Sequence, residues 1–63
     1  MKCMIEEMRL KKGLTQAELS RRTKISQPRI SEYESGKRIP TMVNLFKMSE
    51  AMGCSIADIM EWR

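Results

Sequence analysis

The chain has 63 residues, of which 41% are hydrophobic and 32% are charged, and its formal net charge is +4. This length allows one small domain, and it excludes a TIM barrel, a cofactor-binding α/β domain and any two-domain enzyme. The composition excludes a disordered chain, and the sequence has no run of about 20 apolar residues that could form a transmembrane helix. We therefore expect a single domain over residues 1–63.

The first two predicted helices occupy residues 2–12 and 15–23. Ile5 and Met8 are spaced to face inward on the first helix, and Gly13 is the residue type preferred just after a helix end. The second helix opens with T-Q-A-E at residues 15–18, which fits a capping box. In such a box the Thr15 hydroxyl and the Glu18 carboxylate each accept a hydrogen bond from a backbone N–H.

A third helix is predicted from Ser26 to Ser35. Serine is a preferred N-cap residue, and Pro28 then falls in the first turn, where its missing N–H costs little. Ile30 and Tyr33 lie three residues apart and give this helix an inner side.

The last two helices are predicted to begin after Thr41 and after Ser55, and Ser55 with Asp58 fits a second capping box. The inner face predicted for the fourth helix consists of Met42, Leu45, Met48 or Ser49, and Met52. The apolar face predicted for the fifth helix consists of Ile56, Ile59 and Met60. No stretch alternates at period two for long enough to predict a strand, so the fold is predicted to be all-α with five short helices.

The second and third helices form the most informative pair. Only two residues, Lys24 and Ile25, separate the end of one from the cap of the next, as in a helix-turn-helix unit covering about residues 15–35. Residues 9–38 also carry nine Lys or Arg and only three Glu. This concentration of positive charge indicates a surface that binds a polyanion, although a solvated face of a small basic protein has the same composition.

Residues 13–40 read GLTQAELSRRTKISQPRISEYESGKRIP, and the tail contains the pattern A-x-G-x-S-x-x-x-I. These motifs resemble the Cro and phage-repressor helix-turn-helix family, also called the xenobiotic-response-element family, over almost the whole chain. The resemblance implies a compact five-helix, lambda-repressor-like DNA-binding domain. It further implies a transcriptional regulator that reads double-stranded DNA through its third helix, and a repressor that binds a palindromic operator as a homodimer.

Three residues depart from the usual pattern of that family. Lys24 stands where glycine is common, which predicts a left-handed backbone at a cost of about 1 kcal/mol or a slightly different turn. Ser20 and Thr23 replace a common Ala and a common Leu, and we expect them to weaken the core at the turn.

The resemblance implies base contacts from the outer face of the third helix. Glutamine can pair in a bidentate manner with adenine, and a proline edge can meet a thymine methyl. Glu32 has three alternatives: it reads a cytosine, it orients Arg29, or it forms a plain surface pair with Arg29. The residues expected to face bases are Gln27, Pro28 and Glu32.

Phosphate contacts are expected at the start of the second helix, along the third helix and in the loop that follows it. A helix N-terminus favours an anion through its free N–H groups and its dipole. Each of these residues could instead serve only as a cap or as solvated surface. The residues expected to contact phosphates are Thr15, Gln16, Ser26, Arg29, Ser31, Lys37 and Arg38.

Two further roles follow from the resemblance and from the chain end. Arg9 and Glu34 match family positions that form a partly buried ion pair between the first and third helices. The dimer contact is expected in the last helix, at Ile59, Met60 and Trp62, unless Trp62 folds back onto the first helix.

The sequence offers no chemistry for catalysis. It lacks histidine, has no glycine-rich phosphate loop, and has only two isolated cysteines, Cys3 and Cys54. We therefore expect no enzyme, metal site or cofactor, no ligand-binding domain, no membrane partner, and a location in the cytoplasm. The alternative to a simple regulator is a protein-interaction module, such as an antitoxin, that uses the same DNA-binding fold.

Overall fold

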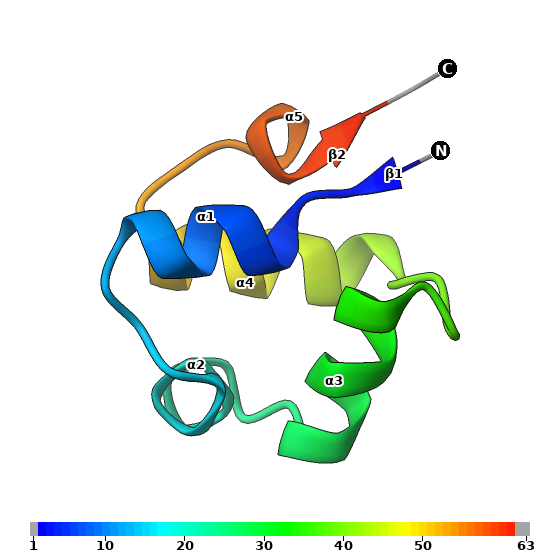
Figure 1. Ribbon diagram of the computed structural model, residues 1–63. Helices are drawn as coiled ribbons and strands as arrows, with labels where there is room; N and C mark the ends of the chain where they lie inside the picture. The colour runs from blue at the N-terminus through cyan, green and yellow to red at the C-terminus, as the bar shows by residue number, and fades with distance from the viewer. Residues whose placement is uncertain (1, 62–63) are drawn as a thin grey trace.

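The computed structural model describes residues 2–61, and in them it confirms the predicted all-α fold (Figure 1). Four of the helices end within one residue of the predicted positions, because their caps and glycines act locally. The helices are α1 (Ile5–Lys11), α2 (Gln16–Thr23), α3 (Gln27–Ser35), α4 (Met42–Met52) and α5 (Ile56–Ile59). The longest of these helices, α4, has 11 residues and is well short of a membrane-spanning length.

The two ends of the described segment pair with each other, which the sequence did not predict. Strand β1 (Lys2–Cys3) runs antiparallel to β2 (Met60–Glu61), and the Met4 N–H donates to the Ile59 carbonyl at 2.7 Å. Residues 2–4 therefore do not belong to α1, which begins at Ile5. Strands of two residues are too short for any period-two pattern, so only the pairing itself reveals them.

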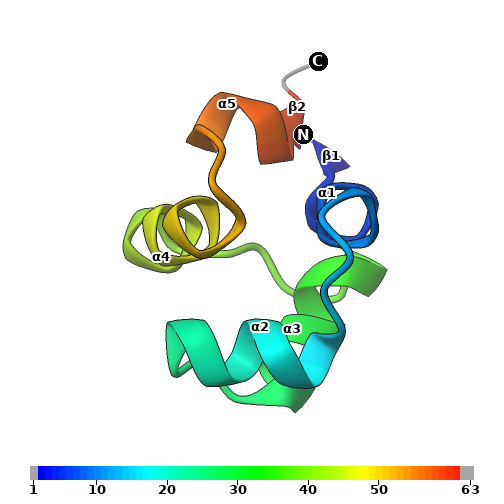
Figure 2. The same ribbon diagram turned by 90° about the vertical axis from the view of Figure 1, so that its left-hand side faces the viewer.

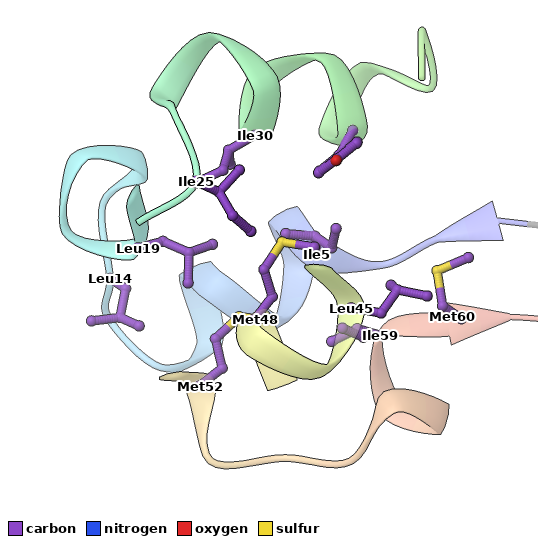
Figure 3. Packing of buried hydrophobic residues seen from close by; sticks show 11 residues of the cluster. Ile5, Leu14, Leu19, Ile25, Ile30, Leu45, Met48, Met52, Ile59 and Met60 are labelled. Carbon is purple, nitrogen blue, oxygen red and sulfur yellow. The ribbon is translucent and has the colours of Figure 1, made fainter. Parts of the chain in front are cut away.

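Every helix contributes a fully buried side chain to one core (Figure 3): Ile5 from α1, Leu19 from α2, Ile30 from α3, Met48 from α4 and Ile59 from α5. Burying an aliphatic side chain of this size stabilises the fold by about 1.5–3 kcal/mol. Because α3 is attached to the core along one side only, its opposite side is left on the surface.

One residue predicted to face the core is exposed instead. Met42, expected on the inner face of α4, is 64% exposed, whereas Leu45, Met48 and Met52 are buried. At 100° per residue Met42 lies at the edge of the stripe formed by the other three, and it belongs to the first turn of the helix. The surface at the N-terminal end of α4 therefore includes an exposed apolar side chain.

The turn between α2 and α3 involves all three departures from the family pattern. Lys24 has φ 61° and ψ 22°, the left-handed conformation that the sequence predicted as one alternative. The Ser20 hydroxyl donates to the Ile25 carbonyl at 2.6 Å, and the Ile25 N–H donates to the Thr23 hydroxyl at 3.2 Å. These hydroxyls satisfy both backbone groups of Ile25, a stabilising role that was not predicted for them.

Replacing Lys24 by glycine is expected to stabilise the protein by about 0.5–1 kcal/mol, because glycine adopts a positive φ without the steric cost of a Cβ. The gain is partly offset by the greater freedom of glycine in the unfolded chain. Thermal unfolding should show a midpoint several degrees higher. Lys24→Ala removes the same charge but keeps the Cβ, so a similar gain from alanine would contradict this explanation.

Candidate nucleic-acid interface

The start of α2 is closed by the predicted capping box. The Thr15 hydroxyl accepts from the Glu18 N–H at 3.1 Å, and the Thr15 N–H donates to the Glu18 carboxylate at 3.0 Å. Hydrogen bonding to the carboxylate from the Thr15 backbone N–H, and then from the Thr15 side chain, holds the pKa of Glu18 below its usual value. The carboxylate is therefore ionised at neutral pH, and its stabilising effect is lost only as the pH falls through that lowered pKa.

The start of α3 presents polar side chains to solvent. Ser26 is the N-cap, with its hydroxyl accepting from the Arg29 N–H at 3.4 Å, as the sequence predicted. Gln27, Pro28 and Ser31 are exposed, as is Arg29. Because Ile30 and Tyr33 anchor the opposite side of the helix in the core, this first turn is rigidly placed and open to a ligand.

The loop after α3 folds back onto the end of that helix. The Lys37 and Arg38 N–H groups donate to the Glu32 carbonyl at 3.0 and 3.3 Å, and Gly36 adopts φ 82° to allow the reversal. The Lys37 and Arg38 side chains remain exposed. The loop therefore holds two cations near the end of α3 in a defined position.

Glu32 lies between two arginines. Its carboxylate is 3.3 Å from Arg38 Nε and 3.7 Å from Arg29 Nε. Such exposed pairs contribute little to stability, generally below about 1 kcal/mol, but they restrict where the two guanidinium groups can point. The charge of Glu32 is thus largely balanced by its neighbours.

Arg9 and Glu34 form the ion pair that the family resemblance implied. Arg9 Nε donates to Glu34 Oε2 at 2.8 Å, and the two side chains are only 10% and 4% exposed. Arg9 also donates to the Leu14 carbonyl at 2.8 Å. The pair ties α1 to α3 and thereby helps to fix the angle of α3.

Gln16 joins this network, a role that the sequence analysis missed. Its Nε2 donates to Glu34 Oε1 at 2.8 Å, so α2 is linked to the same carboxylate as α1. One amide N–H of Gln16 is thereby engaged within the protein. The second N–H is the donor left for the predicted phosphate contact. No motif signalled this bond, since the two residues are 18 positions apart.

Tyr33 and Asn44 make a second unpredicted link. Asn44 Nδ2 donates to the Tyr33 hydroxyl at 2.7 Å and connects α4 to the buried side of α3. A buried tyrosine usually has a hydrogen-bond partner, so the need for one could be expected but its identity could not. Within residues 2–61, no three His, Cys, Asp or Glu side chains gather in a way that could hold a metal ion.

Two of the three residues expected at the dimer contact are buried within a single chain. Ile59 and Met60 are 0% and 3% exposed, because α5 and β2 turn them into the core of a single chain. Their side chains cannot offer a surface to a second chain without unfolding this core, and the expectation is corrected on that ground. Trp62, the third residue of the predicted contact, lies outside the described residues.

The predicted DNA-binding residues come from one end of the molecule. Figures 1 and 2 show α2 and α3 side by side at the end opposite α5. Thr15 and Gln16 begin α2, Ser26 caps α3, and Gln27 and Pro28 form its first turn. The arrangement is a helix-turn-helix with a polar, cation-flanked outer surface, and it has the shape of an element that enters a DNA groove.

Known proteins are similar to this chain in sequence. Residues 5–59 match the helix-turn-helix family model. The HTH-type transcriptional regulator y4dJ of Sinorhizobium fredii is 38% identical over 53 residues, which are 84% of this chain and 69% of that protein. Multiprotein-bridging factor 1c of Arabidopsis thaliana is 34% identical over 53 residues, or 84% of this chain and 36% of that protein.

A solved structure has the same architecture. The restriction-modification controller protein C.AhdI from Aeromonas hydrophila superposes with a TM-score of 0.85 at 24% identity, covering 90% of this chain and 86% of that chain. At this low sequence identity, the likeness to C.AhdI shows that the two chains have the same fold. Together with the family match over residues 5–59 and the identity to y4dJ, the geometry of α2 and α3 leads to one conclusion: the chain belongs to the helix-turn-helix family of DNA-binding transcriptional regulators.

Proposed function

We propose that this protein is a sequence-specific repressor that binds a palindromic site on double-stranded DNA as a homodimer, with α3 in the major groove. The observation that carries the proposal is the exposed first turn of α3, held from behind by Ile30 and Tyr33. The family membership supports DNA binding and transcriptional regulation. Recognition helices of this kind meet base edges with their N-terminal residues.

Gln27 and Pro28 are the proposed base readers. The glutamine amide can donate and accept at once, which matches the N7 and N6 positions of adenine in the major groove. The apolar edge of Pro28 suits the methyl group of a neighbouring thymine. Both side chains are exposed in the first turn of α3, as such contacts require.

We propose that Glu32 positions arginine side chains and does not read a cytosine by itself. Its contacts with Arg29 and Arg38, on either side of it, support the alternative in which the carboxylate orients cations. An arginine held in this way can donate two parallel hydrogen bonds to a phosphate or to guanine.

Phosphate contacts are proposed on both sides of the reading turn. The N-terminus of α2, at Thr15 and Gln16, supplies free N–H groups and a favourable dipole. Ser26, Arg29 and Ser31 supply hydroxyl and guanidinium donors along α3, and Lys37 with Arg38 lies beyond its end. Such contacts fix the register of the protein on DNA without reading its sequence.

Replacing Lys37 by alanine is expected to make the salt dependence of binding less steep. Each neutralised phosphate contributes about −0.9 to the slope of log K against log salt concentration, so the slope should change by about one unit. The preference among sequences should remain. Lys47→Ala removes an exposed lysine from α4, outside the proposed interface, and should leave the slope unchanged. Equal slopes for Lys37→Ala and the unaltered protein would place Lys37 away from DNA.

The proposal as a whole is tested by selecting binding sites from random double-stranded DNA. We expect a two-fold symmetric site with half-site centres about 34 Å apart and two chains bound at saturation in sedimentation experiments. A promoter carrying the selected site should be less active when the protein is present. Recovery of no enriched sequence would contradict sequence-specific binding, and one chain at saturation on every selected site would contradict the dimer.

A further inference from the structure

Exposed apolar side chains gather at one place on the surface. Four large hydrophobic residues between 54% and 69% exposed lie in the loop before α4 and in its first turns, at the end of α4 nearer to α3 (Figure 1). We call this surface the α4 patch, and it consists of Ile39, Met42, Val43 and Phe46.

The α4 patch is large for a molecule of this size. From the exposed fractions, its four side chains present on the order of 500 Å² of surface, within the range in which the largest apolar patch of a monomer often serves an interaction. Among the described residues one other large hydrophobic side chain, Leu10, is exposed, and it comes from α1, on another part of the surface. The patch is therefore a local concentration of apolar area.

Along the outer face of α4, the apolar side chains of the patch come first and the charged side chains follow. Phe46 lies one turn after Met42, and Val43 lies beside them on the outer face of α4. Lys47 and Glu50 continue the same outer face toward the C-terminal end, and both are exposed. Two copies that meet through the patch thus bury no ionised side chain from it, and their charges remain at the rim, where they are solvated.

We propose that the α4 patch is the dimer interface and that its occupant is the same patch of a second copy of this chain. Two patches of this size bury on the order of 1,000 Å², which is the lower limit for a specific but weak protein–protein interface. A two-fold interface requires a self-complementary surface, and a wholly apolar patch satisfies this because it opposes no like charges. The burial of Ile59 and Met60 removes the alternative face on α5 that those side chains would have formed.

The position of the patch also fits the proposed mode of DNA binding. Ile39 follows Lys37 and Arg38 directly, so the patch is continuous with the loop at the end of the recognition helix. A two-fold axis through the patch and toward the DNA places both α3 helices on the same side and leaves the two cationic loops at the rim of the interface. This part of the inference rests on the proposed function, whereas self-association without DNA does not.

The test uses the full chain with Val43 and Phe46 both replaced by glutamine. Both side chains are exposed and glutamine favours helices, so the fold should be retained, and thermal unfolding checks this. Leu10→Gln is the matched control, since it removes an exposed hydrophobic residue from α1. Sedimentation equilibrium without DNA should show weak dimers for the unaltered protein and for Leu10→Gln, and a dimer dissociation constant at least tenfold higher for the double variant.

DNA binding provides an independent measurement on the same variants. On a palindromic site the double variant should lose cooperative occupation of the two halves, while its affinity for a single half-site stays unchanged. If the unaltered protein binds no DNA but dimerises through the patch, the proposed function fails and this inference stands. If the double variant dimerises as well as Leu10→Gln, or if the unaltered protein stays monomeric both free and on palindromic DNA, the inference is overturned.

A charge-swap experiment provides a second measurement, in which the decisive result is a gain of association when two variants are mixed. Phe46→Glu and Phe46→Lys should each raise the dimer dissociation constant when alone, because like charges then face each other across the two-fold axis. An equal mixture of the two variants should associate more tightly than either alone. Equal association of the mixture and the separate variants would contradict a patch-to-patch contact.

Discussion

Replacing Glu34 by alanine is expected to destabilise the protein by about 3 kcal/mol. The change leaves the guanidinium of Arg9 nearly buried with the Leu14 carbonyl as its remaining described partner, and removing one member of a buried ion pair costs about 3–5 kcal/mol. It also frees the Gln16 amide. A core of this size supplies roughly 3–5 kcal/mol in total, so much of the variant should be unfolded at room temperature.

Urea unfolding followed by circular dichroism measures this loss, and two further variants identify its cause. Glu32→Ala removes a carboxylate from the same helix that also pairs with arginine but is more exposed, and it should cost less than about 1 kcal/mol. Replacing Arg9 and Glu34 together by methionine leaves no unpaired charge and should recover most of the stability. Similar losses for Glu34→Ala and Glu32→Ala would show that burial of the Arg9–Glu34 pair has little energetic importance.

Replacing Gln27 by alanine is expected to reduce discrimination at one base pair of the selected site by about 1–3 kcal/mol, which is roughly a 5- to 150-fold change in relative affinity. The glutamine amide makes paired hydrogen bonds that alanine cannot make, and alanine leaves the charge of the protein unchanged. Competition binding with single-base variants of the site measures this loss position by position.

The same variant should be unaltered in two other respects. Gln27 is exposed, so the free energy of unfolding should stay within about 0.5 kcal/mol of the original value. The slope of log K against log salt concentration should also be preserved, in contrast to Lys37→Ala. A loss of affinity that is equal for all sequences would assign Gln27 to the phosphate backbone instead of the bases.

The sequence alone determined the helix-turn-helix and most helix ends. The caps at Thr15, Ser26 and Thr41 depend on residues within one turn, so a short window of sequence contains the whole interaction. The left-handed conformation of Lys24 was one of two alternatives, and it came from the family resemblance, because Lys24 stands where glycine is common. The DNA-reading role of Gln27 and Pro28 remains a prediction from the family resemblance and from their place in the first turn of α3.

Only the tertiary structure decided which residues meet across the fold. The β1–β2 pairing, the bond from Gln16 to Glu34 and the burial of Met60 each depend on elements far apart in the chain. Apolar spacing predicts that one side of a helix is buried, but it does not say how far the neighbouring helices extend over that side. For this reason Met42 matched the inner pattern of α4 and yet lies on the surface, because the elements that bury Leu45 do not extend over it.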